Sequence, residues 1–224
     1  MYFSGNSLTL AALIGWIETQ LPVEVCAGDR HKKDETVNQV ITDSRQLQAG
    51  DVFVALRGDR FDGHSYVAQC LENGAVAAVV DQPVPNVYGV QLVVKDTLAA
   101  YQGIARGWRR QFSIPVVGIT GSAGKTSTKE AIAAVLGMAG KVHKTYANFN
   151  NEIGVPKTLL ALGPDHNFAV VEMAMRGPGQ IAELAVTAEP TIAVITNVGT
   201  AHIGLLGSEQ AIAEIGRASC RERV

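Results

Sequence analysis

Residues 116–126 combine an apolar run, a glycine-rich turn and a lysine–threonine pair, a combination that could cradle a nucleotide phosphate. Gly121 and Gly124 allow backbone N–H groups to turn toward an anion, and a helix that begins after the turn adds the positive end of its dipole. Lys125 would reach the outer phosphates, and the hydroxyl of Thr126 would ligate Mg²⁺. The pattern therefore predicts a nucleotide-phosphate site.

The turn departs from the general phosphate-loop pattern at one position. That pattern has a glycine five residues before Gly124, where this chain has Ile119. A glycine-rich turn that binds no nucleotide is the alternative. The flanks favour phosphate binding, because residues 116–119 suit a buried parallel strand and residues 125–138 suit a helix. One face of that helix is expected to carry Ala131, Ile132, Val135 and Met138.

Polar residues occur at the ends of two later strand-like runs. Glu172 lies within the apolar run 168–174, where a charge needs a partner, and Mg²⁺ at the phosphates would be one. Considered by itself, Glu172 could equally well be a buried carboxylate that caps a neighbouring helix. His202 follows the run 191–198 and should emerge at the same sheet edge, where it could ligate a metal or contact a phosphate. Asn197 could meet a base or ribose, or simply end its strand.

Two loops carry groups that could hold a substrate. The first is rich in amides, which could position substrate oxygens or form turns and a helix cap, and contains Asn148, Asn150 and Asn151. The second follows a strand and reads Asp43, Ser44 and Arg45. An exposed arginine can grip phosphate with its forked guanidinium, although those residues alone favour an ordinary turn with a salt bridge.

Strands that alternate with helices must position these groups, which predicts an α/β fold with parallel sheets. Expected strands cover residues 37–42, 51–56, 77–80, 90–94, 116–119, 168–174 and 191–198, and expected helices cover 7–19, 66–73, 97–111, 125–138, 151–162 and 179–187. Residues 113–115 interrupt the pattern, so we expect one domain over 1–112 and another over 113–214. Three histidines are expected in solvated surroundings: His31, His143 and His166.

Composition limits the classes of partner. The 224 residues are 47% hydrophobic and 18% charged with a net charge of −2, which argues against nucleic acid as a partner. The apolar stretch 8–17 is too short to span a bilayer, and the three cysteines show no CxxC pair. We expect a cytoplasmic protein without membrane insertion. Residues 215–224 have no apolar period and resemble a translated sequencing adapter, so we expect them to be a non-native tail.

Together these motifs resemble the Mur ligases, the ATP-dependent amide-forming enzymes of peptidoglycan precursor assembly. The resemblance covers residues 7–214 and rests on the runs 120–126, 148–156, 171–177 and 197–208. It is closest to the family member that adds D-alanyl-D-alanine to UDP-MurNAc-tripeptide. Residues 43–45 and 62–64 are similar to the N-terminal domain of that member, which in the family holds the UDP-sugar.

The resemblance implies a fold, a mechanism and a set of site residues. The fold is a small N-terminal α/β substrate domain followed by an incomplete P-loop-type parallel-sheet ATPase domain. ATP phosphorylates the terminal carboxylate of UDP-MurNAc-tripeptide, and the amine of D-Ala-D-Ala then displaces phosphate. Lys125 would neutralise the transferring phosphate, Thr126 and Glu172 would hold one Mg²⁺, and His202 would serve a second metal. Expected ATP contacts are Thr120, Gly121, Ser122, Ala123, Gly124, Lys125, Thr126 and Asn197, and expected substrate contacts are Asp43, Ser44, Arg45, Asn148, Asn150 and Asn151.

Two departures from the family pattern accompany this resemblance. Members of the family have a lysine downstream of the histidine that corresponds to His202, and this chain has Gly216 at the position of that lysine. The family also has a C-terminal domain, which has no counterpart in these residues. We therefore expect a fragment that does not turn over. We also expect it to be a monomer. The alternatives are a Mur ligase that acts on UDP-MurNAc-dipeptide, a folylpolyglutamate synthase, a non-catalytic UDP-sugar-binding module and a general P-loop NTPase.

Overall fold

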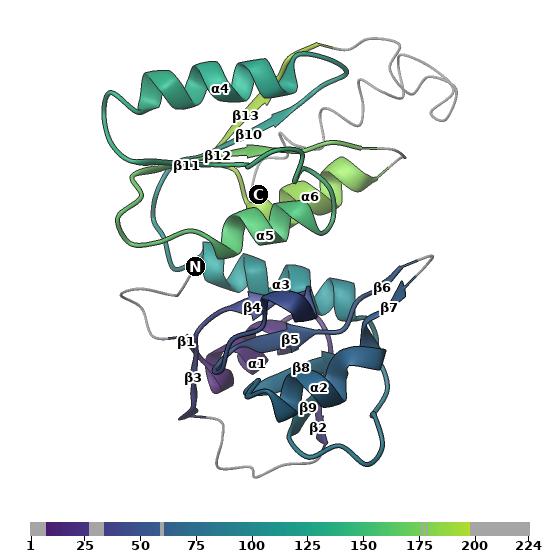
Figure 1. The fold of residues 1–224 in the computed structure, drawn as a ribbon. Coiled ribbons are helices and arrows are strands. Elements are labelled where there is room, and N and C mark those ends of the chain that lie inside the picture. Colours follow the sequence, from purple (N-terminus) through teal and green to yellow (C-terminus); the bar gives the residue numbers. More distant parts are fainter. Residues whose placement is uncertain (1–7, 27–33, 59–60, 176, 178, 198–224) are drawn as a thin grey trace. The chain divides into compact units, whose positions relative to one another are not determined.

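The computed structural model describes residues 8–26, 34–58, 61–175, 177 and 179–197. The chain divides into two compact units, unit 1 (Met1–Gly107) and unit 2 (Trp108–Val224), and each contains its own sheet (Figure 1). The division falls inside a helix, a few residues before the predicted boundary at residue 113. The predicted α/β class is confirmed.

Unit 1 is built on a five-stranded sheet in the order β2-β9-β8-β5-β4. Its strands are β2 (Glu24–Cys26), β4 (Val40–Ile41), β5 (Val52–Val54), β8 (Ala77–Val80) and β9 (Val90–Val93). The strands are parallel except β2, which runs antiparallel to β9. Two short antiparallel pairs complete the strands of this unit: β1 (Leu8–Thr9) with β3 (Thr36–Val37), and β6 (Arg57–Gly58) with β7 (Phe61–Asp62).

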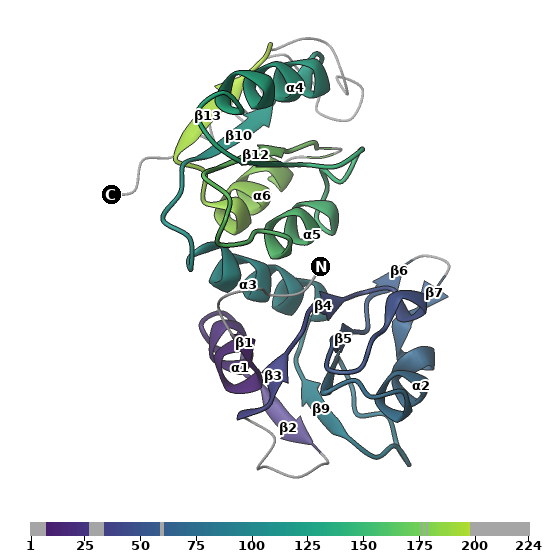
Figure 2. The same cartoon turned by 60° about the vertical axis from the view of Figure 1, so that its left-hand side comes forward.

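The helices of unit 1 cover both faces of this sheet. They are α1 (Leu10–Glu18), α2 (Val67–Glu72) and α3 (Thr97–Arg109), with the 3₁₀ turns η2 (Ser44–Gln46) and η3 (Gly63–Tyr66). Figure 2 shows α1 and α2 on opposite sides of the sheet. On the α2 side, Phe53 and Ala78 pack against Val67. Thr9 caps α1 by accepting a hydrogen bond from the backbone N–H of Ala12 at 3.2 Å.

Unit 2 is built on a fully parallel sheet in the order β11-β12-β10-β13. Its strands are β10 (Val116–Thr120), β11 (Val142–Lys144), β12 (Phe168–Glu172) and β13 (Ile192–Ile195), and its helices are α4 (Lys125–Leu136), α5 (Gly154–Leu160) and α6 (Gln180–Ala188). Figure 1 shows α4 on one face of the sheet and α5 and α6 on the other. Because the strands are parallel, the segments that follow β10, β12 and β13 all leave from one edge.

The predicted apolar face of α4 is correct at Ile132 and wrong at Ala131, Val135 and Met138, which are exposed. Lys129 and Ala133 are its buried residues, whereas Val135 and Met138 are 68% and 90% exposed. Ile132 and Leu136 complete the packed face, on a core that includes Val117, Ile119 and Val170. The residues that face the sheet follow the spacing i, i+3, i+4 and i+7, and that set begins at a lysine rather than at an apolar side chain.

Several predicted elements differ in extent. Residues 37–42 do not form one strand, because β3 and β4 belong to different sheets. The helix predicted over 151–162 begins only at Gly154, and α1 begins after Thr9, not at residue 7, which lies outside the described residues. The strands β2, β6, β7 and β11 were not predicted. They have two or three residues each, too few to show a period.

Two histidines expected in solvent are buried or half-buried in unit 2 instead. His166 is 8% exposed, His143 is half-buried, and their ring centroids lie 4.9 Å apart. The Nε2 of His143 lies 2.7 Å from the carbonyl oxygen of Thr158, and the backbone N–H of Gly163 donates to Nδ1 of His166 at 2.9 Å. Burial lowers the pKa of both rings. His31 lies outside the described residues.

Within the described part of the chain, no helix has both the length and the apolar character needed to cross a membrane.

Acidification should destabilise unit 2 through these two rings. Their folded pKa values lie below the ordinary value of 6.5, so the unfolded chain takes up protons first as the pH falls. The contribution to stability is therefore complete above about pH 6.5 and is lost as the pH falls through that value toward the folded pKa. Urea denaturation at about pH 7.5 and about pH 5.5 measures the loss.

The double variant His143→Gln with His166→Asn is the control for that experiment. Its amides keep a donor toward Thr158 and an acceptor for Gly163 but do not titrate. We expect a clearly smaller loss of unfolding free energy between the two pH values. An unchanged loss would assign the acid sensitivity to other groups.

Candidate functional site

The phosphate loop joins β10 to α4, and two of its glycines adopt conformations that other residues rarely adopt. Gly121 has φ +134° and Gly124 has φ +78°. A Cβ added at Gly121 would lie 2.2 Å from Oγ1 of Thr196, so a side chain is excluded there by space as well as by conformation. The loop thereby reaches the N-terminus of α4 with its backbone close to the end of β13.

Lys125 and Thr126 occupy the first turn of α4. The ammonium of Lys125 donates to the carbonyl oxygen of Gly121 at 2.7 Å, which folds the side chain back over the loop. The hydroxyl of Thr126 donates to Oε2 of Glu172 at 3.0 Å. The two side chains predicted to serve phosphate and metal therefore flank the same turn.

Glu172 ends β12 and is 2% exposed. Its partner in the sheet register is Ile119 of β10, so its carboxylate lies at the base of the phosphate loop. Oε1 accepts from the amide of Asn150 at 2.8 Å, and the backbone N–H of Glu172 donates to Oγ1 of Thr145 at 2.9 Å. This buried carboxylate is held by hydrogen bonds from two separate segments.

Lys129 is the residue of this site that the sequence did not reveal. Its side chain is 2% exposed, and its ammonium donates to the carbonyl oxygen of Thr145 at 2.9 Å. The ammonium also lies 3.9 Å from Oε2 of Glu172 and 3.3 Å from Oε1 of Glu130. Its spacing from Thr126 places both on one helix face, which is a signal that could have suggested a shared partner.

The donors around Glu172 fit a magnesium ion. Glu172 and Thr126 bring a carboxylate and a hydroxyl oxygen within 3.0 Å of each other beside the phosphate loop, and hard cations take such oxygens. The described residues contain no cluster of three or more His, Cys, Asp or Glu that could form a metal cage. Mg²⁺ typically combines one or two protein oxygens with phosphate and water, so a cage is not required. His202, predicted as a further ligand, lies outside the described residues.

The end of β13 closes the phosphate loop. Oδ1 of Asn197 accepts from the backbone N–H of Ala123 at 2.9 Å, and the carbonyl oxygen of Asn197 accepts from the N–H of Ser122 at 3.1 Å. The hydroxyl of Thr196 donates to the carbonyl oxygen of Ala123 at 2.6 Å. Asn197 therefore contacts loop amides of the kind that bind phosphate. Thr120, predicted to contact ATP, is buried at the end of β10.

The three asparagines of the amide-rich loop lie in different surroundings. Asn150 reaches Glu172, and its carbonyl oxygen accepts from the N–H of Ala174 at 2.8 Å. Oδ1 of Asn151 accepts from the N–H of Gly154 at 2.9 Å at the start of α5. Asn148 is exposed. Only one of the three touches the carboxylate at the phosphate loop.

Unit 1 contains a cavity of about 410 Å³ at the other predicted substrate residues. Its lining combines aromatic and charged side chains with small polar groups, and consists of Thr42, Asp43, Ser44, Arg45, Phe53, Phe61, Gly63 and Tyr66. The carboxylate of Asp43 holds the guanidinium of Arg45 through two hydrogen bonds of 2.9 and 2.8 Å. Phe61 and Tyr66 are 54% and 46% exposed. Such a cavity suits a planar ring joined to an anionic group.

Comparison with known protein families matches both units. Residues 36–109 match the Mur ligase family catalytic domain, and residues 119–217 match the Mur ligase middle domain. The chain is 64% identical over 184 residues to the UDP-N-acetylmuramoyl-tripeptide–D-alanyl-D-alanine ligase of Synechocystis, which covers 81% of this chain and 40% of the relative. It is 40% identical over 191 residues to the enzyme of that name from Escherichia coli, with 85% and 42% covered.

Solved structures agree with these matches. A crystal structure of MurF from Acinetobacter baumannii superposes with a TM-score of 0.86 at 34% identity and covers 98% of this chain and 47% of that protein. The MurF ligase of Thermotoga maritima in complex with ADP superposes with a TM-score of 0.76 at 37% identity, with 81% and 42% covered. The chain thus spans less than half the length of these relatives.

Loss of the Lys129 ammonium should destabilise unit 2 strongly. In Lys129→Met a side chain of similar length keeps the packing, but the carbonyl of Thr145 and the carboxylate of Glu172 lose a buried cation. We expect the free energy of unfolding to fall by about 3 kcal/mol, measured by urea denaturation.

Lys144→Met is the matched control for that variant. Lys144 pairs with Glu130 at the surface, and its side chain is 44% exposed, so we expect a loss below about 1 kcal/mol. Equal losses of unfolding free energy in the two variants would show that the burial of Lys129 does not increase its contribution to stability.

Proposed function

Since this chain belongs to the Mur ligase family, we propose that it forms the substrate-binding and ATP-binding part of a ligase that joins D-alanyl-D-alanine to UDP-MurNAc-tripeptide in peptidoglycan precursor synthesis. The terminal carboxylate of the tripeptide attacks the γ-phosphorus of ATP, and ADP leaves. The amine of D-Ala-D-Ala then attacks the acyl phosphate carbonyl, phosphate leaves, and an amide bond remains. A cytoplasmic location and a monomeric state remain predictions.

The arrangement of Lys125, Thr126 and Glu172 around one helix turn is the observation that carries this proposal. Mg²⁺ bound by Thr126 and Glu172 would supply positive charge beside the β- and γ-phosphates. Lys125 would leave the carbonyl of Gly121 and bind the transferring phosphate. Phosphoryl transfer of this kind needs positioning and charge neutralisation more than covalent chemistry, and these side chains are placed to provide both.

The other predicted ATP contacts support the same site. The backbone N–H groups of Ser122 and Ala123 already bind oxygens of Asn197, so they have the orientation that an anion requires. We propose that phosphate oxygens take the place of the asparagine side-chain oxygen when ATP binds. Asn150 donates to Glu172, and we propose that it orients this carboxylate and also contacts the substrate carboxylate that is phosphorylated.

The unit 1 cavity is our candidate for the uridine end of the sugar nucleotide. The exposed rings of Phe61 and Tyr66 offer apolar faces to a planar base. Arg45 and the hydroxyl of Ser44 lie in the same cavity and suit phosphate oxygens. We propose that Asp43 contributes by holding the Arg45 guanidinium in a fixed orientation.

Magnesium should strengthen ADP binding through Thr126 and Glu172. Isothermal titration with ADP, with and without Mg²⁺, should show a large ratio of affinities in the wild type. In Thr126→Val and Glu172→Gln that ratio should fall about tenfold, because each variant removes one hard oxygen ligand or its charge. Glu183→Gln, on the exposed side of α6, should leave the ratio unchanged. A wild type whose ADP affinity ignores Mg²⁺ would contradict the proposed ligand pair.

Tyr66 should contribute to the binding of UDP-MurNAc-tripeptide. Loss of one aromatic ring that stacks on a base weakens binding by about 1–3 kcal/mol, so Tyr66→Ala should raise the Kd by about fivefold or more. Tyr88→Ala is the matched control, because Tyr88 is 97% exposed and does not line the cavity. Titration calorimetry measures both, and equal Kd values for the two variants would rule out the cavity as the nucleotide site.

A further inference from the structure

One wall of the unit 1 cavity comes from a segment that the main sheet does not hold. Phe61, Gly63 and Tyr66 belong to β7 and η3, and within the described part of the chain β7 pairs only with β6, through two residue pairs. A two-stranded pair of this size is not stable by itself in water. Other contacts must therefore fix the wall.

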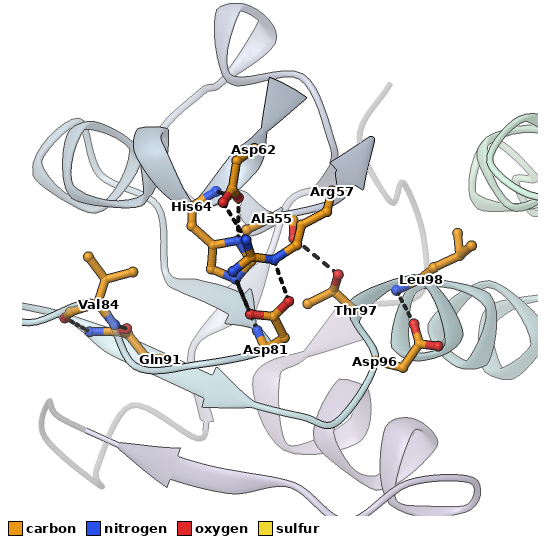
Figure 3. Close-up of polar contacts among 10 residues, drawn as sticks. All are labelled: Ala55, Arg57, Asp62, His64, Asp81, Val84, Gln91, Asp96, Thr97 and Leu98. Carbon is orange, nitrogen blue, oxygen red and sulfur yellow. Dashed lines mark hydrogen bonds and ion pairs between the residues drawn. The ribbon is translucent and has the colours of Figure 1, made fainter. Parts of the chain in front are cut away.

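Four charged or polar side chains from separate elements meet next to this segment in the chain, as Figure 3 shows. We call Arg57, Asp62, His64 and Asp81 the His64 network. The guanidinium of Arg57 donates to Asp81 from Nε at 2.6 Å and from Nη2 at 3.0 Å, and to Asp62 from Nη1 at 2.5 Å. Asp81 directly follows β8, a central strand of the sheet, so it anchors the network to the core of the unit.

His64 lies between the two carboxylates with its side chain only 9% exposed. The backbone N–H of Asp81 donates to its Nε2 at 3.0 Å, so Nε2 is an acceptor and the ring proton of the neutral form is on Nδ1. Nδ1 lies 2.7 Å from Oδ1 of Asp62, which accepts that proton's hydrogen bond. Nε2 also lies 3.1 Å from Oδ1 of Asp81, so each ring nitrogen faces one of the two aspartates, and together they fix the orientation of the ring.

Both carboxylates of the network are held in the ionised form. The backbone N–H of His64 lowers the pKa of Asp62, and the hydrogen bond from Arg57 lowers the pKa of Asp81. Arg57 contributes one positive charge against these two negative charges. The network is therefore ordered by charge-assisted hydrogen bonds, which are stronger than neutral ones.

The backbone around the network leaves little freedom for an alternative path. The N–H of Gly63 donates to the carbonyl oxygen of Leu56 at 2.8 Å, and a Cβ at Gly63 would lie 2.8 Å from that oxygen. The hydroxyl of Thr97 donates to the carbonyl oxygen of Ala55 at 3.0 Å (Figure 3). These contacts fix the backbone at the start of η3, and Asp62 caps this turn by accepting a hydrogen bond from the backbone N–H of His64 at 2.9 Å.

The geometry points to His64 as a positioning residue for nucleotide binding: through Asp62 and Asp81 it holds Tyr66 and the cavity wall in the conformation that receives the uridine end of the substrate. This inference rests on the proposed function, because it takes the cavity as the site for UDP-MurNAc-tripeptide. His64 does not line the cavity, so it acts through the wall.

The test measures the Kd of UDP-MurNAc-tripeptide for the full chain by titration calorimetry. His64→Ala should raise that Kd about tenfold, because two ordered hydrogen bonds are lost. His64→Asn, whose amide N–H can replace Nδ1–H toward Asp62, should recover most of the affinity. Affinity for ADP in unit 2 should stay unchanged in both variants, which controls for general loss of folded protein.

A double-mutant cycle with Tyr66→Ala separates positioning from general destabilisation. If His64 acts through the wall, His64→Ala should add little to the loss already caused by Tyr66→Ala. The inference would be overturned if the Kd of the double variant rose by the product of the two single-variant increases, or if His64→Ala kept the wild-type Kd. Either result would leave the proposed function intact. A wild-type chain that does not bind UDP-MurNAc-tripeptide would overturn the proposed function and this inference with it.

Discussion

The burial of one carboxylate, Glu172, sets the arrangement of the phosphate site in unit 2. A carboxylate is costly to remove from water unless hydrogen bonds and opposite charge replace its hydration. Glu172 obtains them from α4, through Thr126 and Lys129, and from the loop before α5, through Asn150. These groups are distant in the sequence. Satisfying a single side chain therefore fixes both the rotation of a helix about its axis and the path of a loop.

The sequence was sufficient to predict the site where the residues that provide the chemistry also determine the local conformation of the backbone. The glycine spacing and Lys125–Thr126 predicted the loop between β10 and α4, since Gly121 needs a conformation and a space that exclude a side chain. It was also sufficient to show that Glu172 needs a partner. It could not identify Lys129, because a lysine in a helix is normally solvated, and only the tertiary position of Glu172 and Thr145 makes its burial favourable.

The elements that could not be predicted are those fixed by contacts distant in the sequence. The β6–β7 pair has two residues per strand, which is too short for any period, and charges rather than apolar residues hold it in place. Likewise His143 and His166 lie in polar sequence surroundings, yet the fold brings their rings together. Apolar periodicity reports which face of an element packs on a core. It carries no information about a side chain whose position is set by a hydrogen-bond partner elsewhere in the chain.

The two units use the same physical device at different places. In each, apolar parallel strands form a stable sheet, and a carboxylate at the end of a strand gathers segments that the sheet cannot pair: Glu172 ends β12, and Asp81 follows β8. These edge segments depend on hydrogen bonds and ion pairs in place of strand pairing. Loss of one member leaves the remaining buried charges unpaired, which costs more than the lost contact itself. A few polar contacts therefore shape both candidate binding surfaces, and where such a contact is buried, as at Lys129, it also contributes to the stability of the unit.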